Sequence, residues 1–179
     1  DKIGKIRGES KIIAHGLNLN RSFKKKKYTN KKYRFFYVSN IDYYKNQIFL
    51  LKALDFFIEK NPKLKNLLNI EFYGGYYLPA LKKFNYYLLN KVQNKKNFKY
   101  YGFKDSKLIY KDQKGIDTIF LFSSTCENFS VSLIEGMSSG YPIMCVDQQP
   151  MKSVLGRGAI FYKHNSISSF QNKLNKIIF

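Results

Sequence analysis

Short, continuous apolar runs alternate along the chain with longer segments in which apolar residues recur every three or four positions. The run Tyr33–Ser39, for example, reads YRFFYVS and is typical of a strand buried on both faces. Seven such runs predict strands: Lys11–Gly16, Tyr33–Ser39, Leu68–Gly75, Phe98–Phe103, Asp117–Ser124, Pro142–Asp147 and Gly158–Tyr162.

The segments between these runs predict helices. In residues 46–60 one face carries Ile48, Leu51, Leu54 and Ile58, the other Lys52, Asp55 and Glu59, and Asn61-Pro62 ends the pattern. Pro79 suits the first turn of a second helix, whose apolar stripe is Leu81, Phe84, Leu88 and Val92. Three further helices are expected at Ser106–Gln113, at Ser130–Ser139 before Gly140, and from Ser166 onward, the last with Ile167, Phe170, Leu174 and Ile177 on one face.

Strands separated by helices predict βαβ units and a parallel sheet. We therefore expect an α/β, doubly wound, Rossmann-like layer and a single domain over residues 1–179. In such sheets ligands bind beyond the carboxyl ends of the strands. The segments that follow strands are thus the candidate site: Ser39–Lys45, Gly74-Gly75, Gly102-Phe103 and Ser123–Ser130.

Charge changes this picture only in part. The formal net charge is +20, but only four of the 32 basic residues are Arg, the residue that recognises phosphates and guanine edges in a bidentate manner. Lys, Asn, Ile, Tyr and Phe all have A/T-rich codons, so codon bias explains most of the charge. We expect no specific nucleic-acid partner, and an anionic membrane surface is the better candidate for the cationic face.

The apolar runs are too short to span a bilayer, and no secretory signal is visible. Cys126 and Cys145 form no metal-binding pattern, so we expect both to be small buried side chains in the cytoplasm. Neither His15 nor His164 has a neighbouring group that suggests a catalytic triad, and no metal-ligand cluster is present in the sequence.

The segment after the strand Asp117–Ser124 carries two carboxylates eight positions apart, Glu127 and Glu135. A helix that begins near Ser130 presents free N–H groups and the positive end of its dipole, which suits a phosphate. The two carboxylates could accept hydrogen bonds from the hydroxyls of a sugar nucleotide. The alternative is structural: Ser132 and Glu135 match a capping box, and Glu127 favours the helix dipole.

Two more candidates lie after other strands. Lys45 precedes a helix and could reach back over the strand ends toward a phosphate, although it is also one surface lysine among many. Gly74-Gly75 would allow close approach of a ligand to the backbone, but no third glycine completes a dinucleotide fingerprint.

These pieces occur in an order that resembles the C-terminal, donor-binding domain of glycosyltransferase family 4, whose members are retaining enzymes of the GT-B fold. The resemblance covers nearly the whole chain. Its most specific part is IYKDQKGIDTIFLFSSTCENFSVSLIEGMSSGYPIMCVD, which carries both glutamates; IIAHGLNLN, FFYVSNIDYYKNQIFLLKAL, IEFYGG and FKYYGF match the other segments.

The resemblance implies a role for each candidate. Glu127 would face the donor sugar, Glu135 would bind ribose hydroxyls, and Lys45 would neutralise the leaving diphosphate in place of a divalent metal. Other donor contacts are implied at the amides of Asn128, Phe129, Ser130 and Val131, at Gly74 and Gly75, at Ser39-Asn40 where the family often has Gly-Arg, and at Phe103 and Lys104 for the base. No metal and no cofactor beyond the nucleoside-diphosphate sugar is implied.

The implied protein is a retaining, hexosyl-type glycosyltransferase that moves a sugar to a glycan or lipid-linked acceptor in cell-surface polysaccharide synthesis. Such enzymes need an N-terminal acceptor domain, which this chain does not contain, so we expect no turnover by the chain alone. We expect it in the cytoplasm, with a peripheral position at the inner face of the membrane as an option. The alternatives are an inert half-domain and a cationic module for membrane or nucleic acid.

Overall fold

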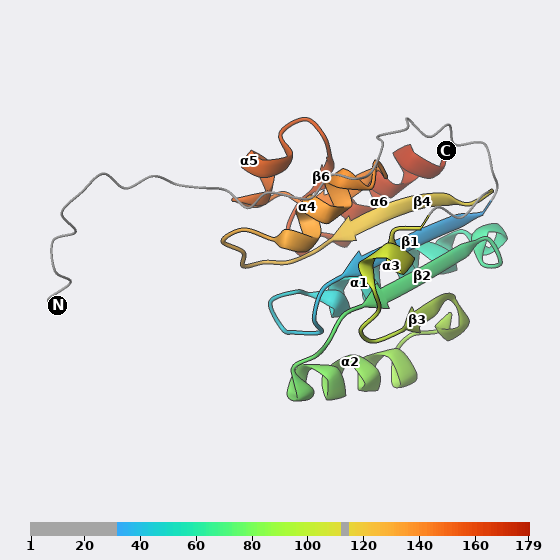
Figure 1. Ribbon diagram of the computed structural model, residues 1–179. Helices are drawn as coiled ribbons and strands as arrows, with labels where there is room; N and C mark the ends of the chain where they lie inside the picture. The colour runs from blue at the N-terminus through green and yellow to red at the C-terminus, as the bar shows by residue number, and fades with distance from the viewer. Residues whose placement is uncertain (1–31, 112–114) are drawn as a thin grey trace, which may run out of the picture.

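The computed structural model describes residues 32–111 and 115–179. Six strands of this part of the chain form one wholly parallel sheet in the order β3-β2-β1-β4-β5-β6 (Figure 1). The strands are β1 (Tyr33–Val38), β2 (Leu68–Tyr73), β3 (Phe98–Tyr100), β4 (Asp117–Phe122), β5 (Ile143–Val146) and β6 (Ile160–Tyr162). The strand order reverses between β1 and β4, which places the two strands side by side at the centre of the sheet.

Helices cover both faces of this sheet (Figure 1). They are α1 (Gln47–Lys60), α2 (Leu78–Asn90), α3 (Ser106–Ile109), α4 (Val131–Ser138), α5 (Met151–Leu155) and α6 (Ile167–Ile178), with single 3-10 turns at Pro62–Leu64 and Lys95–Asn97. Helix α1 packs against both α2 and α6, while α3 and α4 lie on the other face. The predicted α/β, Rossmann-like fold is therefore confirmed.

Burial on both faces explains why the strands are continuous apolar runs rather than alternating ones. All six residues of β4 are buried, as are four of the six in β1. Aromatic side chains fill both layers: Phe49 of α1 stacks on Tyr162 and meets Phe170 edge-on, while Phe36 meets Phe120 edge-on on the opposite face.

The central strands also bury a charged pair. The Arg34 Nε donates to Glu71 across β1 and β2 at 2.6 Å, and the Tyr73 hydroxyl donates to the same carboxylate at 2.7 Å. The Arg34 guanidinium lies 4.5 Å from the ring centroid of Phe36. Burial, followed by the Glu71 hydrogen bond, raises the pKa of Tyr73 to about 12. The pairing satisfies charges that would otherwise be too costly to bury.

Helix α1 differs from its predicted pattern at one position. Asp55 was expected on the solvent face with Lys52 and Glu59, but its carboxylate is buried. It accepts hydrogen bonds from the backbone N–H groups of Gln93 and Asn94, each at 2.9 Å. The periodic pattern predicts that a carboxylate faces solvent, and it cannot predict a hydrogen-bond donor 38 residues away in the sequence.

Helix α5 was not predicted. It has five residues, and only Met151 and Leu155, one turn apart, are buried in it. That is too short a segment for apolar periodicity to be recognised. The predicted strand Lys11–Gly16, which includes His15, lies outside the described residues.

Candidate functional site

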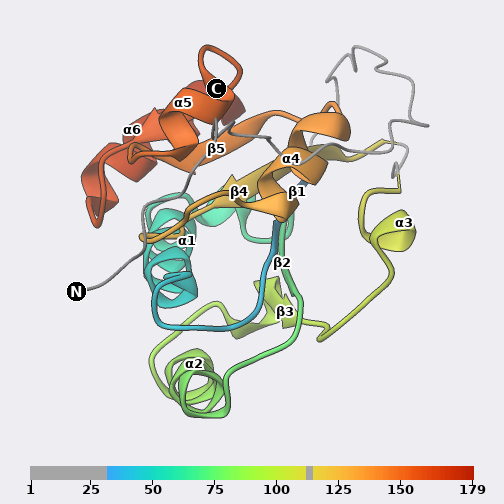
Figure 2. The same cartoon turned by 60° about the vertical axis from the view of Figure 1, so that its left-hand side comes forward.

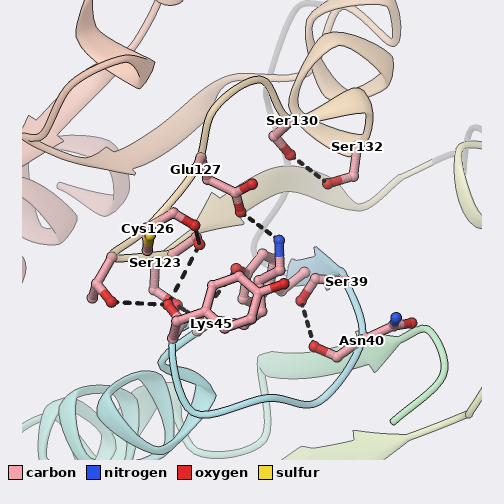
Figure 3. Close-up of polar contacts among 12 residues, drawn as sticks. Ser39, Asn40, Lys45, Ser123, Cys126, Glu127, Ser130 and Ser132 are labelled. Carbon is pink, nitrogen blue, oxygen red and sulfur yellow. Dashed lines mark hydrogen bonds and ion pairs between the residues drawn. The ribbon is translucent and has the colours of Figure 1, made fainter. Parts of the chain in front are cut away.

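The candidate site lies at the carboxyl ends of β1 and β4. Because these strands are neighbours where the strand order reverses, the loops that follow them leave the sheet side by side. Ser39, Asn40 and Lys45 belong to the loop after β1, and Glu127 to the loop after β4 (Figure 3). The structure thus brings together residues that are more than 80 positions apart.

An ion pair joins the two loops. The Lys45 ammonium donates a hydrogen bond to the Glu127 carboxylate, and the two side chains are only 12% and 9% exposed (Figure 3). The ammonium also lies 4.8 Å from the ring centroid of Tyr44. A pair this shielded from water interacts more strongly than a surface pair and holds a specific geometry.

Hydrogen bonds to main-chain carbonyls hold Lys45 in place. The Ser123 hydroxyl at the end of β4 donates to the Lys45 carbonyl oxygen at 2.7 Å, and the Tyr37 hydroxyl donates to the same oxygen at 3.2 Å. The Thr125 N–H donates to the neighbouring Tyr44 carbonyl at 2.7 Å. Sequence analysis missed Tyr37 as a site residue because it reads as an ordinary core residue of a buried strand.

The turn directly after β1 has its own support. The buried Gln47, the first residue of α1, donates through Nε2 to the Ser39 hydroxyl at 2.9 Å and to the Asn40 carbonyl at 2.8 Å. Behind this turn lies Gly74, which has a φ of +130°; a Cβ there would lie 2.3 Å from the Ser39 carbonyl oxygen. The close approach at Gly74 is therefore made by the main chain of Ser39, and a Cβ on Gly75 would lie 3.0 Å from the Asn40 side chain.

The start of α4 completes the site. Ser130 is the N-cap, its hydroxyl lies 3.1 Å from that of Ser132, and no described side chain caps the helix (Figure 3). The capping box expected at Ser132 and Glu135 is therefore wrong, because Ser132 already lies inside the helix. Asn128 and Val131 are exposed and Phe129 is half-buried. The amide groups at this helix start point the positive end of the dipole toward the loop that carries Glu127.

Three predicted site residues remain apart from the ion pair. Glu135 is half-buried on the second turn of α4, and its carboxylate has no hydrogen bond or ion pair with any described residue. Phe103, 84% exposed, and the exposed Lys104 follow β3, two strands away from β1. Gly74 is linked to that region, since its N–H donates to the Gly102 carbonyl at 2.9 Å.

Other reactive groups add little to the site. Cys145 is buried as expected, but Cys126 is exposed beside Glu127, because it lies in the loop rather than at the end of β4. His164 is exposed. In residues 32–111 and 115–179, no three His, Cys, Asp or Glu side chains gather where they could hold a metal ion. Among the helices of the described residues, none has the length and hydropathy of a membrane-spanning segment.

A wholly parallel α/β sheet whose strand order reverses beside a cation, a carboxylate and a helix start defines a domain of the Rossmann-like class. The family model described as "Glycosyl transferases group 1" matches residues 20–178. The chain therefore belongs to the group 1 glycosyltransferase family. No curated protein sequence matches it.

Solved glycosyltransferases share the fold. A trehalose-phosphate synthase (UDP-forming) from Burkholderia vietnamiensis superposes with a TM-score of 0.70 at 9% identity, over 82% of this chain and 37% of that one. Anabaena Alr3699/HepE in complex with UDP gives 0.67 at 17% identity, over 83% and 39%. S. aureus TarM, solved with fondaparinux, alpha-GlcNAc-glycerol and UDP, gives 0.65 at 16% identity, over 87% and 30%. The chain thus spans well under half the length of these proteins.

Proposed function

We propose that this chain is the donor-binding half of a retaining glycosyltransferase. It would hold a nucleoside-diphosphate sugar while a hexosyl group passes to a glycan or lipid-linked acceptor, in the synthesis of a cell-surface polysaccharide. The single observation that carries the proposal is the Lys45–Glu127 ion pair at the switch point of the sheet, beside the start of α4.

The pair supplies the two charges that the reaction needs. When a donor binds, its diphosphate would replace Glu127 as the partner of Lys45, and Glu127 would turn to a hydroxyl of the sugar. With this rearrangement complete on binding, Lys45 then offsets the negative charge that grows on the departing nucleoside diphosphate, without further reorganisation during the chemical step. The amides of Asn128, Phe129, Ser130 and Val131 would bind sugar or phosphate oxygens at the helix start.

The remaining residues would hold the nucleoside. Glu135, whose carboxylate lacks a described partner, would accept hydrogen bonds from ribose hydroxyls. The turn at Ser39, Asn40, Gly74 and Gly75 would border the phosphates, and Phe103 and Lys104 would contact the base. UDP is the first nucleotide to test, because Anabaena Alr3699/HepE and S. aureus TarM were solved with it.

Lys45 would take the place of a divalent metal at the diphosphate. An N-terminal acceptor domain would close over the donor, so the chain by itself would bind donor weakly and not turn over. The protein would work in the cytoplasm, at the inner face of an anionic membrane.

The experiment is a thermal-unfolding titration of the full-length protein with nucleoside diphosphates. UDP or another nucleoside diphosphate should raise Tm, and Lys45→Gln and Glu135→Gln should each remove most of that shift. Lys52→Gln and Glu59→Gln are matched controls, since both residues are exposed on α1 and should leave the shift unchanged. Absence of a Tm shift with every nucleoside diphosphate would refute the proposal.

Glu127→Gln separates binding from chemistry. The substitution frees Lys45 from its intramolecular partner, so affinity for a nucleoside diphosphate should stay equal or rise. Sugar transfer by the full-length enzyme should fall by on the order of a hundredfold, because the sugar loses its carboxylate contact. Unchanged transfer would remove Glu127 from the mechanism.

A further inference from the structure

A second surface lies on α2 and the segment that follows it, at the β3 edge of the sheet. From Tyr76 to Lys104 the chain carries seven lysines and no Asp or Glu, and all seven lysines are exposed. Figure 2 shows α2 end-on at the bottom of the view, with α5 and α6 at the top. A strongly cationic strip therefore runs along one edge of the molecule.

The same strip exposes large apolar side chains. On α2, Leu78, Tyr86 and Leu89 are 53%, 58% and 61% exposed. At the helical spacing of 100° per residue they lie on one face, together with Lys82. Tyr76 and Tyr77, just before the helix, are 57% and 53% exposed. We call these five apolar residues with the neighbouring Lys82 and Lys83 the α2 surface.

We propose that the α2 surface is a docking site for an anionic lipid bilayer. Leucine and tyrosine side chains beside lysines, with no carboxylate among them, match the composition of helices that lie in the membrane interface. Tyrosine rings are favoured at the level of the lipid headgroups, and each lysine adds attraction to anionic lipids. The lysine stems can lie along the apolar layer while their ammonium groups stay in water.

Charge argues against other occupants. A second copy of this chain brings the same net charge of +20. Residues 1–31 carry ten Lys and Arg against only Asp1 and Glu9, so they too are repelled by the strip. The strip contains no Arg, which is the preferred residue for base and phosphate readout in nucleic acids.

The α2 surface adjoins the candidate donor site. The ring of Tyr77 meets that of Tyr43, from the loop that carries Lys45, edge-on at 6.2 Å between centroids. The Lys83 ammonium lies 5.6 Å from the same Tyr43 ring. If the proposed function holds, docking here would place the sheet edge near an acceptor whose lipid lies in the bilayer; the docking itself does not depend on donor binding.

The test is co-sedimentation of the full chain with vesicles of phosphatidylglycerol, of phosphatidylcholine, and of their mixture. The wild-type protein should bind phosphatidylglycerol vesicles and not phosphatidylcholine vesicles. Leu78→Gln/Tyr86→Gln/Leu89→Gln should bind on the order of tenfold more weakly, and so should Lys82→Gln/Lys83→Gln. All five side chains are exposed, and circular dichroism will show that the variants stay folded.

Lys173→Gln/Lys176→Gln is the matched control. It removes the same charge from α6, which packs on β6 at the other end of the sheet, and should bind vesicles as the wild type does. Equal losses in the control and in the α2 variants would overturn the proposal, since the binding would then follow net charge alone.

Loss of oligonucleotide binding with intact vesicle binding in the α2 variants would also overturn it and would identify the α2 surface as a nucleic-acid-binding surface. Nucleotide affinity, measured in parallel, separates failure here from failure of the donor proposal.

Discussion

At the scale of single residues, the site depends on positions that look unremarkable in the sequence. Ser123 and Tyr37 reach it through their hydroxyls, both of which donate to the Lys45 carbonyl. Gly74 contributes by having no side chain at all. These residues do not face a ligand; they fix the main chain from which Lys45 extends.

Gly74 provides the residue-scale prediction. Gly74→Ala would combine a φ of +130° with a Cβ 2.3 Å from the Ser39 carbonyl oxygen, so the turn after β1 would have to move. We expect the free energy of unfolding to fall by at least about 2 kcal/mol, measured by urea denaturation.

Gly102→Ala is the matched control for this substitution. Gly102 also has a positive φ, +66°, but no atom lies within 4 Å of the position that its Cβ would take. Only the backbone strain remains there, and it should cost about 1 kcal/mol. Equal losses in the two variants would show that the contact with Ser39 is unimportant.

At the scale of helices and strands, periodicity and strand composition predicted most of the fold. The six described strands and helices α1, α2, α3, α4 and α6 lie where the sequence pattern put them, because both faces of the sheet are covered and the apolar runs are unbroken. Long-range partners were not predictable: Asp55 binds backbone N–H groups that follow α2, and Arg34 pairs with Glu71 across two strands. Parallel topology explains why Lys45 and Glu127 could be proposed for one site, whereas their direct ion pair required coordinates.

The loop that carries Lys45 gives the element-scale prediction. Tyr37→Phe removes one of the two hydroxyl donors to the Lys45 carbonyl and keeps the ring, so stability should fall by about 1 kcal/mol. If Lys45 binds the diphosphate, the less firmly held loop should also weaken nucleotide affinity by at least about threefold, measured by calorimetry.

Tyr162→Phe is the comparison variant. Its hydroxyl is equally buried and donates to the Phe122 carbonyl at 3.1 Å, so it makes no hydrogen bond to the loop that carries Lys45. This variant should lose similar stability and keep its nucleotide affinity. Equal weakening of nucleotide binding in both variants would assign the effect to general loosening of the core.

At the scale of the whole molecule, two surfaces meet at the carboxyl edge of one sheet. The donor site lies at the switch point between β1 and β4, and the α2 surface begins after β2, where Ile41 pairs with Tyr76, and continues along α2. Buried aromatic side chains contribute a large share of the core that connects them. Several of those are tyrosines whose hydroxyls are inside the protein, which makes the stability of the whole fold depend on alkaline pH.

Burial raises the pKa of Tyr37 and of Tyr162 above the ordinary value, and that of Tyr73 to about 12. In the unfolded chain these phenols ionise at pH ~10, whereas in the folded protein they keep their protons to higher pH. Above pH ~10 the folded state therefore binds more protons than the unfolded state. The contribution of these tyrosines to stability is complete below pH ~10 and is lost as the pH rises toward their pKa values in the folded state. In this window each such tyrosine should lower the free energy of unfolding by about 1.4 kcal/mol per pH unit.

Urea denaturation of the wild type and of Tyr162→Phe should therefore give parallel pH profiles below pH ~9. Above pH ~10 the variant's stability should fall less steeply by about that amount, and identical slopes there would show that the Tyr162 phenol ionises as readily in the fold as in water.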